Sequence, residues 1–221
     1  MILRENHYKS QAGIYPLTEG IFPVVKPKGI TSYDVIRNIK KMHPGKKIGH
    51  GGTLDPLASG VLIIAIGSKY TKQLHNVLNN TIKTYKVDIR LGAISVTNDS
   101  EGPIHEVKHA RVPTTADIKN VLKEFEGVIY QIPPIYSAVK INGTAAYKLA
   151  RRGERIVIKS KKVAIDSIKI ESYFYPNLSL TVNCHSGVYI RALVRDIGKR
   201  LGCGGYVVEL IRTRVGEYTL Q

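Results

Sequence analysis

A single acidic residue, Asp55, stands in a loop rich in glycine, and its carboxylate is the group of this sequence best placed to do chemistry. The stretch Gly49–Gly60 reads Gly-His-Gly-Gly-Thr-Leu-Asp-Pro-Leu-Ala-Ser-Gly. Glycine allows positive φ angles and a close approach of the backbone to a ligand, and Pro56 biases Asp55 toward an extended or turn conformation. The apolar run Val61–Ile66 follows at once and predicts a buried strand. Such a loop could hold a carboxylate at the mouth of a sheet, but Asp-Pro and Gly-Gly are also ordinary turn chemistry, and composition alone favours a simple turn.

The elements that must position this loop are strands with helices between them. Thr84–Leu91 alternates apolar and polar residues, which predicts a half-buried strand. Further strands are predicted over 20–26, 61–66, 156–174, 178–184 and 207–218, and helices over 31–42, 70–78, 114–125, 145–152 and 189–201. No βαβ repeat is evident, so the sequence predicts an α+β fold with a mixed, largely antiparallel central sheet and flanking helices.

The composition indicates a globular protein with a polyanionic partner. The 221 residues include 43% hydrophobic residues, and 33 Lys and Arg against 17 Asp and Glu give a net charge of +16. Such an excess favours nucleic acid as the partner, although a basic proteome or a membrane-surface protein would also explain it. We see no bilayer-spanning run or signal peptide. Two cysteines without CxxC spacing and scattered histidines predict free thiols, no metal and a cytoplasmic location.

The string from His50 to Gly60 resembles the catalytic motif of the bacterial TruB-type tRNA pseudouridine synthases, and the resemblance extends over roughly residues 20–218. That family converts the uridine at position 55 of the tRNA T loop into pseudouridine. The resemblance therefore implies a pseudouridine-synthase-like fold, a flipped base, Asp55 as the catalytic carboxylate and no cofactor. Whether the acid adds to the uracil ring or manages charge at the ribose carbon stays open.

The resemblance also implies roles for three residues around the base. Lys83–Val87 resembles the family strand whose tyrosine packs on the target base, which assigns that role to Tyr85; a core tyrosine is the structural alternative. Ser186–Arg191 resembles the family's Gly-x-Tyr-Ile-Arg motif, so Tyr189 would line the uracil pocket and Arg191 would pair with Asp55. The alternatives are a helix anchor for the tyrosine and a solvated charge for the arginine.

Three further positions match the family around the active-site loop. His50 would sit beside the flipped nucleotide, although a surface-loop histidine is the alternative. Leu210 would lie under the substrate base, in a segment where Ile211 replaces the usual arginine. Lys26, in the Lys-Pro-Lys-Gly opening, would support the loop.

The segment of about 127–153 resembles the family's mobile insertion that closes over the T loop. Its basic residues interleave with tyrosines, which suits phosphate contact and base stacking. Lys140, Arg151 and Arg152 are the predicted RNA-binding residues. A solvated helix face is the alternative for Arg152 taken by itself.

The domain prediction is an N-terminal arm over 1–19 and a catalytic domain over 20–221, without the C-terminal PUA domain that most relatives carry. We therefore expect a stand-alone monomeric enzyme that acts on the T arm of tRNA and needs no membrane or obligate protein partner. Two alternatives remain open: a guide-RNA-dependent pseudouridylase, and a non-catalytic tRNA-binding or folding factor.

Overall fold

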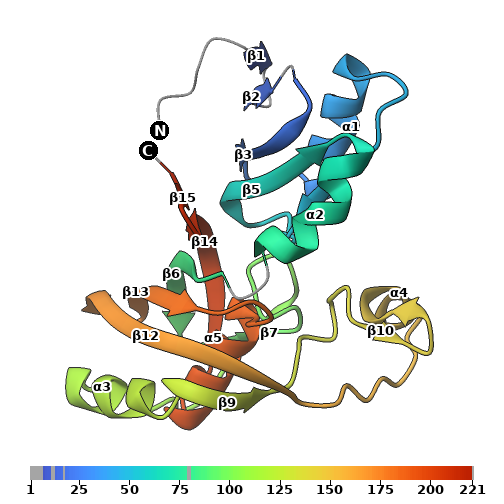
Figure 1. The fold of residues 1–221 in the computed structure, drawn as a ribbon. Coiled ribbons are helices and arrows are strands. Elements are labelled where there is room, and N and C mark those ends of the chain that lie inside the picture. Colours follow the sequence, from blue (N-terminus) through green and yellow to red (C-terminus); the bar gives the residue numbers. More distant parts are fainter. Residues whose placement is uncertain (1–6, 11–12, 17, 79–80, 221) are drawn as a thin grey trace. The chain divides into compact units, whose positions relative to one another are not determined.

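The chain forms two compact units, and each is described by itself. The structure, a computed structural model, describes residues 7–10, 13–16, 18–78 and 81–220. Unit 1 comprises Met1–Lys86 and Leu210–Gln221, and unit 2 comprises Val87–Glu209. Strands β6 (Lys83–Leu91) and β14 (Gly205–Val215) each contribute residues to both units (Figure 1). The predicted limits of an arm and a catalytic domain stay predictions.

Unit 1 is built around β5 (Ser59–Ile66), whose residues from Val61 to Ile66 are all buried. β5 pairs antiparallel with β3 and β4 and parallel with β14, while α2 packs against β4 and β5 (Figure 1). The other elements of the unit are β1 (His7–Ser10), β2 (Gly13–Pro16), β3 (Gly20–Lys26), α1 (Ser32–Met42), β4 (Ile48–Gly51), α2 (Ser68–Leu78) and β15 (Tyr218–Thr219).

Helix α1 precedes the active-site loop, and its sequence explains where it begins and which face is buried. Thr31 is the N-cap, and Thr31 and Asp34 form a reciprocal capping box that satisfies two orphan backbone donors. Its buried residues Val35, Ile36 and Ile39 recur at helical spacing, so one face packs inward. The helix predicted over 31–42 is confirmed, with Ser32–Met42 as its observed span.

Unit 2 is built on antiparallel strands. β12 pairs with β9 on one side and β13 on the other, and the whole sheet is ordered β3-β5-β14-β6-β13-β12-β9. Its elements are β7 (Ala93–Ser95), β8 (Ile104–Glu106), α3 (Thr115–Lys123), β9 (Gly127–Gln131), β10 (Lys140–Ile141), β11 (Thr144–Ala145), α4 (Ala146–Arg151), β12 (Lys161–Phe174), β13 (Asn177–Cys184) and α5 (Ile190–Arg200). The predicted α+β class with a mixed, largely antiparallel sheet is confirmed.

The strand predicted over 156–174 begins only at Lys161, so the prediction was wrong for residues 156–160. The register explains the difference, because Lys161 pairs with Gln131, the last residue of β9. Beyond Gln131 the chain reads Ile-Pro-Pro, and proline cannot donate to a ladder. Within the described ranges, residues 156–160 therefore pair with no strand, and Val157 is 81% exposed.

Candidate active site

The loop between β4 and β5 carries Asp55 and is anchored on both sides of it. The buried Ser32 hydroxyl accepts from the Leu54 backbone N–H at 2.9 Å and donates to the Leu54 carbonyl at 3.0 Å. The side chains of Leu54 and Leu57 are each only 3% exposed. Asp55 itself is half-buried between them. Apolar burial on either side and one buried hydroxyl thus fix where its carboxylate stands.

Lys26 holds the next residue of the loop. Its side chain is fully buried, and its ammonium group donates to the carbonyls of Pro27 at 2.8 Å, Ile30 at 2.7 Å and Pro56 at 3.4 Å. The Gly29 backbone N–H also donates to the Pro56 carbonyl, at 2.8 Å. A buried ammonium needs such acceptors, and this arrangement ties the turn after β3 to the loop. The predicted support role matches this geometry and stays a prediction about activity.

Arg212, on β14, is a site residue that the sequence did not predict. Its side chain is 1% exposed. Nε donates to the Val61 carbonyl at 2.8 Å, and Nη2 donates to the Gly52 carbonyl at 2.8 Å. Gly52 has a φ of 69°, and a Cβ there would lie 3.2 Å from Nη1 of Arg212. The guanidinium therefore joins the central strand to the loop three residues before Asp55.

Tyr85 lies beside the same guanidinium. Nη1 of Arg212 is 3.5 Å from the Tyr85 hydroxyl, and the guanidinium carbon lies 6.0 Å from the centre of the ring. Tyr85 is 7% exposed and belongs to the inward-facing set of β6, as the alternation predicts. Leu210 is 5% exposed on β14 and lies on the same buried face as Arg212. Unit 1 thus brings Tyr85 and the loop of Asp55 to one buried arginine.

His50 lies on β4, opposite Ile64 of β5, and is half-buried. Its Nδ1 atom is buried and has no hydrogen-bond partner among the described residues. Burial lowers the pKa of this imidazole, and the positive charge of Arg212 lowers it further. His50 is therefore neutral at neutral pH and does not add a positive charge to the site.

His50 should make the protein less stable in mild acid. Well above the ordinary histidine pKa of about 6.5, the imidazole is neutral in both the folded and the unfolded chain. As the pH falls below that value, the unfolded chain takes up a proton that the folded chain refuses until its own lowered pKa is passed. The free energy of unfolding therefore falls over this window, by at most about 1.4 kcal/mol per pH unit for one proton.

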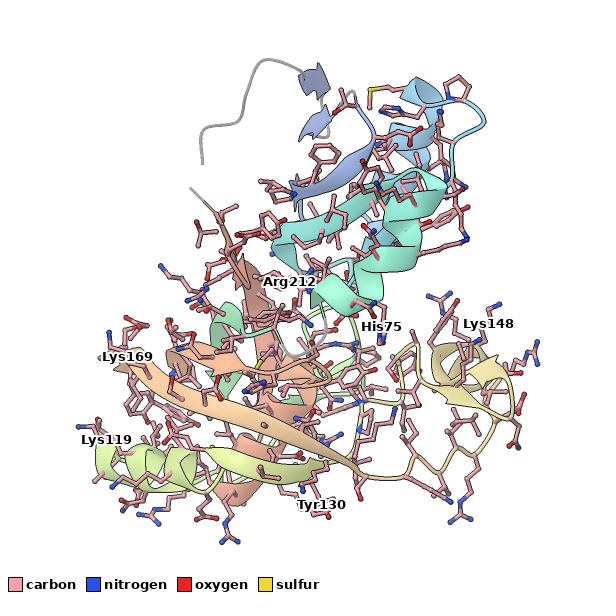
Figure 2. All side chains as sticks on the ribbon, in the orientation of Figure 1. His75, Lys119, Tyr130, Lys148, Lys169 and Arg212 are labelled. Carbon is pink, nitrogen blue, oxygen red and sulfur yellow. The ribbon has the colours of Figure 1, made fainter. Side chains whose placement is uncertain are left out.

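Urea unfolding between pH 7.5 and pH 5 measures this effect. The His50→Gln variant should lose part of the acid-side decline, whereas His75→Gln should keep it, because His75 is an exposed residue of α2 (Figure 2). Equal pH profiles for the His50 variant and the wild type would contradict the prediction.

In unit 2, Arg191 already has an acidic partner. Its guanidinium lies 3.3 Å from the Asp99 carboxylate and donates at 2.9 Å to the carbonyls of Thr97 and Tyr136. Arg191 and Asp99 are both nearly fully buried, and the Glu101 backbone N–H donates to Asp99 at 3.0 Å. The sequence did not predict this ion pair. Asp55 belongs to unit 1, so the predicted pairing of Asp55 with Arg191 stays a prediction.

Tyr189 is the N-cap of α5 and is held by its backbone. Its N–H donates to the Gln131 side-chain oxygen at 2.8 Å, and its carbonyl accepts from the Gln131 amide nitrogen at 3.2 Å. Gln131 is buried at the end of β9. This contact orients the first turn of the helix that carries Arg191, and the half-buried Tyr189 side chain stays the predicted pocket residue.

The three predicted RNA-binding residues are exposed. Lys140 lies on β10, Arg151 ends α4 with its guanidinium 5.6 Å from the Tyr147 ring centre, and Arg152 makes a 3.7 Å ion pair with Glu154. Lys148 also points outward from α4 (Figure 2). Exposed cations beside an aromatic ring fit contact with a phosphate backbone, and the structure does not test that role.

Across the described ranges, no group of three His, Cys, Asp or Glu side chains is arranged to hold a metal ion. Cys184 and Cys203 are free and buried. The helices that the structure describes are all too short or too polar to cross a lipid bilayer.

Comparison with known proteins gives consistent matches over nearly the whole chain. A family model described as TruB family pseudouridylate synthase (N terminal domain) matches residues 40–190. A second, described as tRNA pseudouridylate synthase B C-terminal domain, matches residues 191–221. tRNA pseudouridine synthase B of Clostridium acetobutylicum is 45% identical over 90% of this chain and 68% of that protein. The enzyme of the same name from Chlamydia felis is 42% identical over 92% of this chain and 86% of that protein.

Solved structures match as well. A chain in a Cbf5-Nop10-Gar1 complex superposes with a TM-score of 0.69 and 32% identity, over 93% of this chain and 51% of that chain. A chain in an H/ACA RNP bound to a substrate RNA containing 2′-deoxyuridine gives a TM-score of 0.66 and 28% identity, over 100% of this chain and 58% of that chain. This chain therefore spans little more than half the length of these two solved chains.

Proposed function

The chain belongs to the TruB family of pseudouridylate synthases, and from this membership we propose that it converts uridine to pseudouridine in the T loop of tRNA, at position 55. The curated relatives that carry the name tRNA pseudouridine synthase B support tRNA as the substrate. The observation that carries the proposal is the half-buried Asp55 in a loop fixed by Ser32, Lys26 and Arg212.

The reaction is an isomerisation and needs no redox partner. The glycosidic bond from N1 of uracil to C1′ of ribose breaks, the base turns, and a new bond forms between C5 and C1′. The proton that C5 carried is lost and N1 gains one, so atoms balance without a cofactor. A carboxylate can serve either as a nucleophile or as a stabiliser of positive charge at C1′, and we assign this role to Asp55.

The remaining site residues would act on a base that has left the RNA stack. We assign Tyr85 and Leu210 to the two sides of the uracil, Tyr189 to the pocket wall and His50 to the flipped nucleotide. Arg191 would orient the Asp55 carboxylate by a charge-assisted hydrogen bond. Lys26 would keep the loop in place through the Pro56 carbonyl. We also infer that the enzyme works as a cytoplasmic monomer.

The direct test uses T-arm RNA that carries tritium at C5 of its uridines. Isomerisation turns C5 into the glycosidic carbon, so the purified chain should release one tritium per modified uridine into solvent. A chain that binds this RNA and releases no tritium would instead support the reading as a non-catalytic tRNA-binding factor.

The same assay separates the stand-alone enzyme from a guide-dependent one. The solved neighbours include a chain in an H/ACA RNP bound to a substrate RNA, whereas the relatives with 45% and 42% identity are named as tRNA enzymes. We therefore expect release from a bare T-arm hairpin without added protein or guide RNA. A requirement for either would favour the guide-dependent alternative.

Binding of tRNA should be strongly salt-dependent. The net charge of +16 and the exposed cations around α4 motivate this expectation, because each phosphate neutralised on single-stranded RNA adds roughly −0.7 to the slope of log K against log salt. The Lys140→Gln, Arg151→Gln and Arg152→Gln variants should each reduce the steepness of the slope by about one contact.

Affinity measured over a salt series for these variants checks the prediction. Lys119→Gln is the matched control, because Lys119 is an exposed lysine on α3, at the opposite end of unit 2 from Lys148 (Figure 2). It should keep the wild-type slope. Three insertion variants with the slope of the control would mean that this surface is only solvated.

A further inference from the structure

Arg212 touches three separate parts of unit 1 around the active-site loop. Its fork of donors reaches the Val61 carbonyl on β5, the Gly52 carbonyl in the loop and the Tyr85 hydroxyl on β6. β14 itself is brought close to β5 at this point, since Arg212 pairs with Gly60. Gly60 has a φ of 105°, and a Cβ there would collide with the Arg212 backbone carbonyl. The backbone that carries the guanidinium is thus held tightly.

Stability alone does not explain a charge at this position. Arg212 is 1% exposed and makes no ion pair with an acid in the described part of the chain. A buried cation costs several kcal/mol of desolvation, and an apolar residue of similar volume is often as stable or more so. Hydrogen bonds to the two carbonyls and the hydroxyl recover part of this cost. We therefore look for the role of the guanidinium in the positions of the groups that it contacts.

We propose that Arg212 is a positioning residue that ties the loop carrying Asp55 to Tyr85, so that the carboxylate and the aromatic ring reach the base in a single fixed arrangement. The inference rests on the proposed function for its effect on rate. The contacts of the guanidinium with the loop and with the tyrosine exist in the protein without RNA, so they can be tested separately from the reaction.

The contact between Arg212 and the active-site loop is tested without RNA. Arg212→Lys keeps the charge but replaces a planar fork with a point-like ammonium, so it should lose at least one of the contacts. Hydrogen exchange of peptides covering residues 48–60 should become faster in Arg212→Lys. Arg214→Lys is the matched control, because Arg214 is an exposed residue two positions along the same strand, and its exchange should equal that of the wild type.

The contact between Arg212 and the Tyr85 hydroxyl is tested by a double-mutant cycle on the single-turnover rate of tritium release. Arg212→Lys should slow that rate by about 100-fold, the scale for misplacing a group by about 1 Å, while its Kd for tRNA stays near wild type. In a Tyr85→Phe background the same substitution should cost much less, since the hydroxyl that Arg212 positions is already gone. A merely structural arginine would give equal rate losses in both backgrounds.

Gly52→Ala provides a second variant should Arg212→Lys fail to fold. Its Cβ would crowd Nη1 of Arg212 at 3.2 Å, so it should show the same faster exchange and slower release. The proposal is overturned if loop exchange is unchanged in these variants or if the two substitutions of the cycle act independently. A wild type that releases no tritium contradicts the proposed function instead, and the exchange measurement still decides whether Arg212 holds the loop.

Discussion

Asp55→Asn is expected to abolish tritium release while binding of tRNA persists. An amide neither attacks carbon as a carboxylate does nor stabilises a positive charge at C1′. The loss should reach many orders of magnitude, well beyond the ~10²–10⁴ typical of general acid–base assistance. The substitution nearly preserves shape, and Ser32 and Lys26 hold the loop through backbone atoms of Leu54 and Pro56, so the fold should survive.

Single-turnover release and tRNA affinity, measured on the same preparation, check this expectation. Asp166→Asn is the control, because Asp166 is an exposed acid in unit 2 whose carboxylate lies 3.0 Å from the His185 ring. It should release tritium at the wild-type rate. Ordinary turnover by the Asp55 variant would remove the carboxylate from the mechanism.

The parts of the fold that local pattern dictates could be predicted. β3 and α1 were predicted within one residue, because an apolar run, a Pro-x-Gly turn and a capping Thr-x-x-Asp follow one another in sequence. β4 was not predicted. Its residues Gly49 and Gly51 have low strand propensity, and the strand exists because His50 and its neighbours pair with the buried β5.

Two charged residues of the site were not predicted, and the reason is the same for both. Arg212 and Asp99 are ordinary charged residues in the sequence, and each becomes buried only through partners distant along the chain. One signal was available for Arg212: it lies two positions after Leu210, so the period of a strand places both on the same face. Nothing local shows that Asp99 would meet Arg191, 92 positions further along by their numbering.

The motif nominates Asp55, and the resemblance assigns roles to Tyr85, Tyr189 and Arg191, which stay predictions. The contacts that hold them, from Arg212 to Gly52 and from Gln131 to Tyr189, depend on tertiary packing that no spacing rule encodes. These supports are where a substitution outside the motif should alter the rate.

Tyr85→Phe and Tyr85→Leu are expected to separate what the hydroxyl does from what the ring does. The Phe variant keeps an aromatic face, and stacking on a base is worth about 1–3 kcal/mol. It loses the hydroxyl that faces Arg212. If that hydroxyl transfers a proton, the Phe variant should bind tRNA normally and turn over at least ~10²-fold more slowly. The Leu variant should show the same loss of rate and also weaker binding of T-arm RNA.

Affinity and single-turnover release for both variants measure the two effects independently. Tyr33→Phe is the matched control, since Tyr33 is 55% exposed on α1, and it should behave as wild type. A thermal unfolding scan guards against a packing defect, because Tyr85 is 7% exposed and the Leu variant removes buried volume. Should both variants bind and turn over normally, Tyr85 would be an ordinary core tyrosine, and the base would have to meet another aromatic face. That outcome would also remove the partner through which Arg212 acts, because a hydroxyl without influence on the rate needs no positioning.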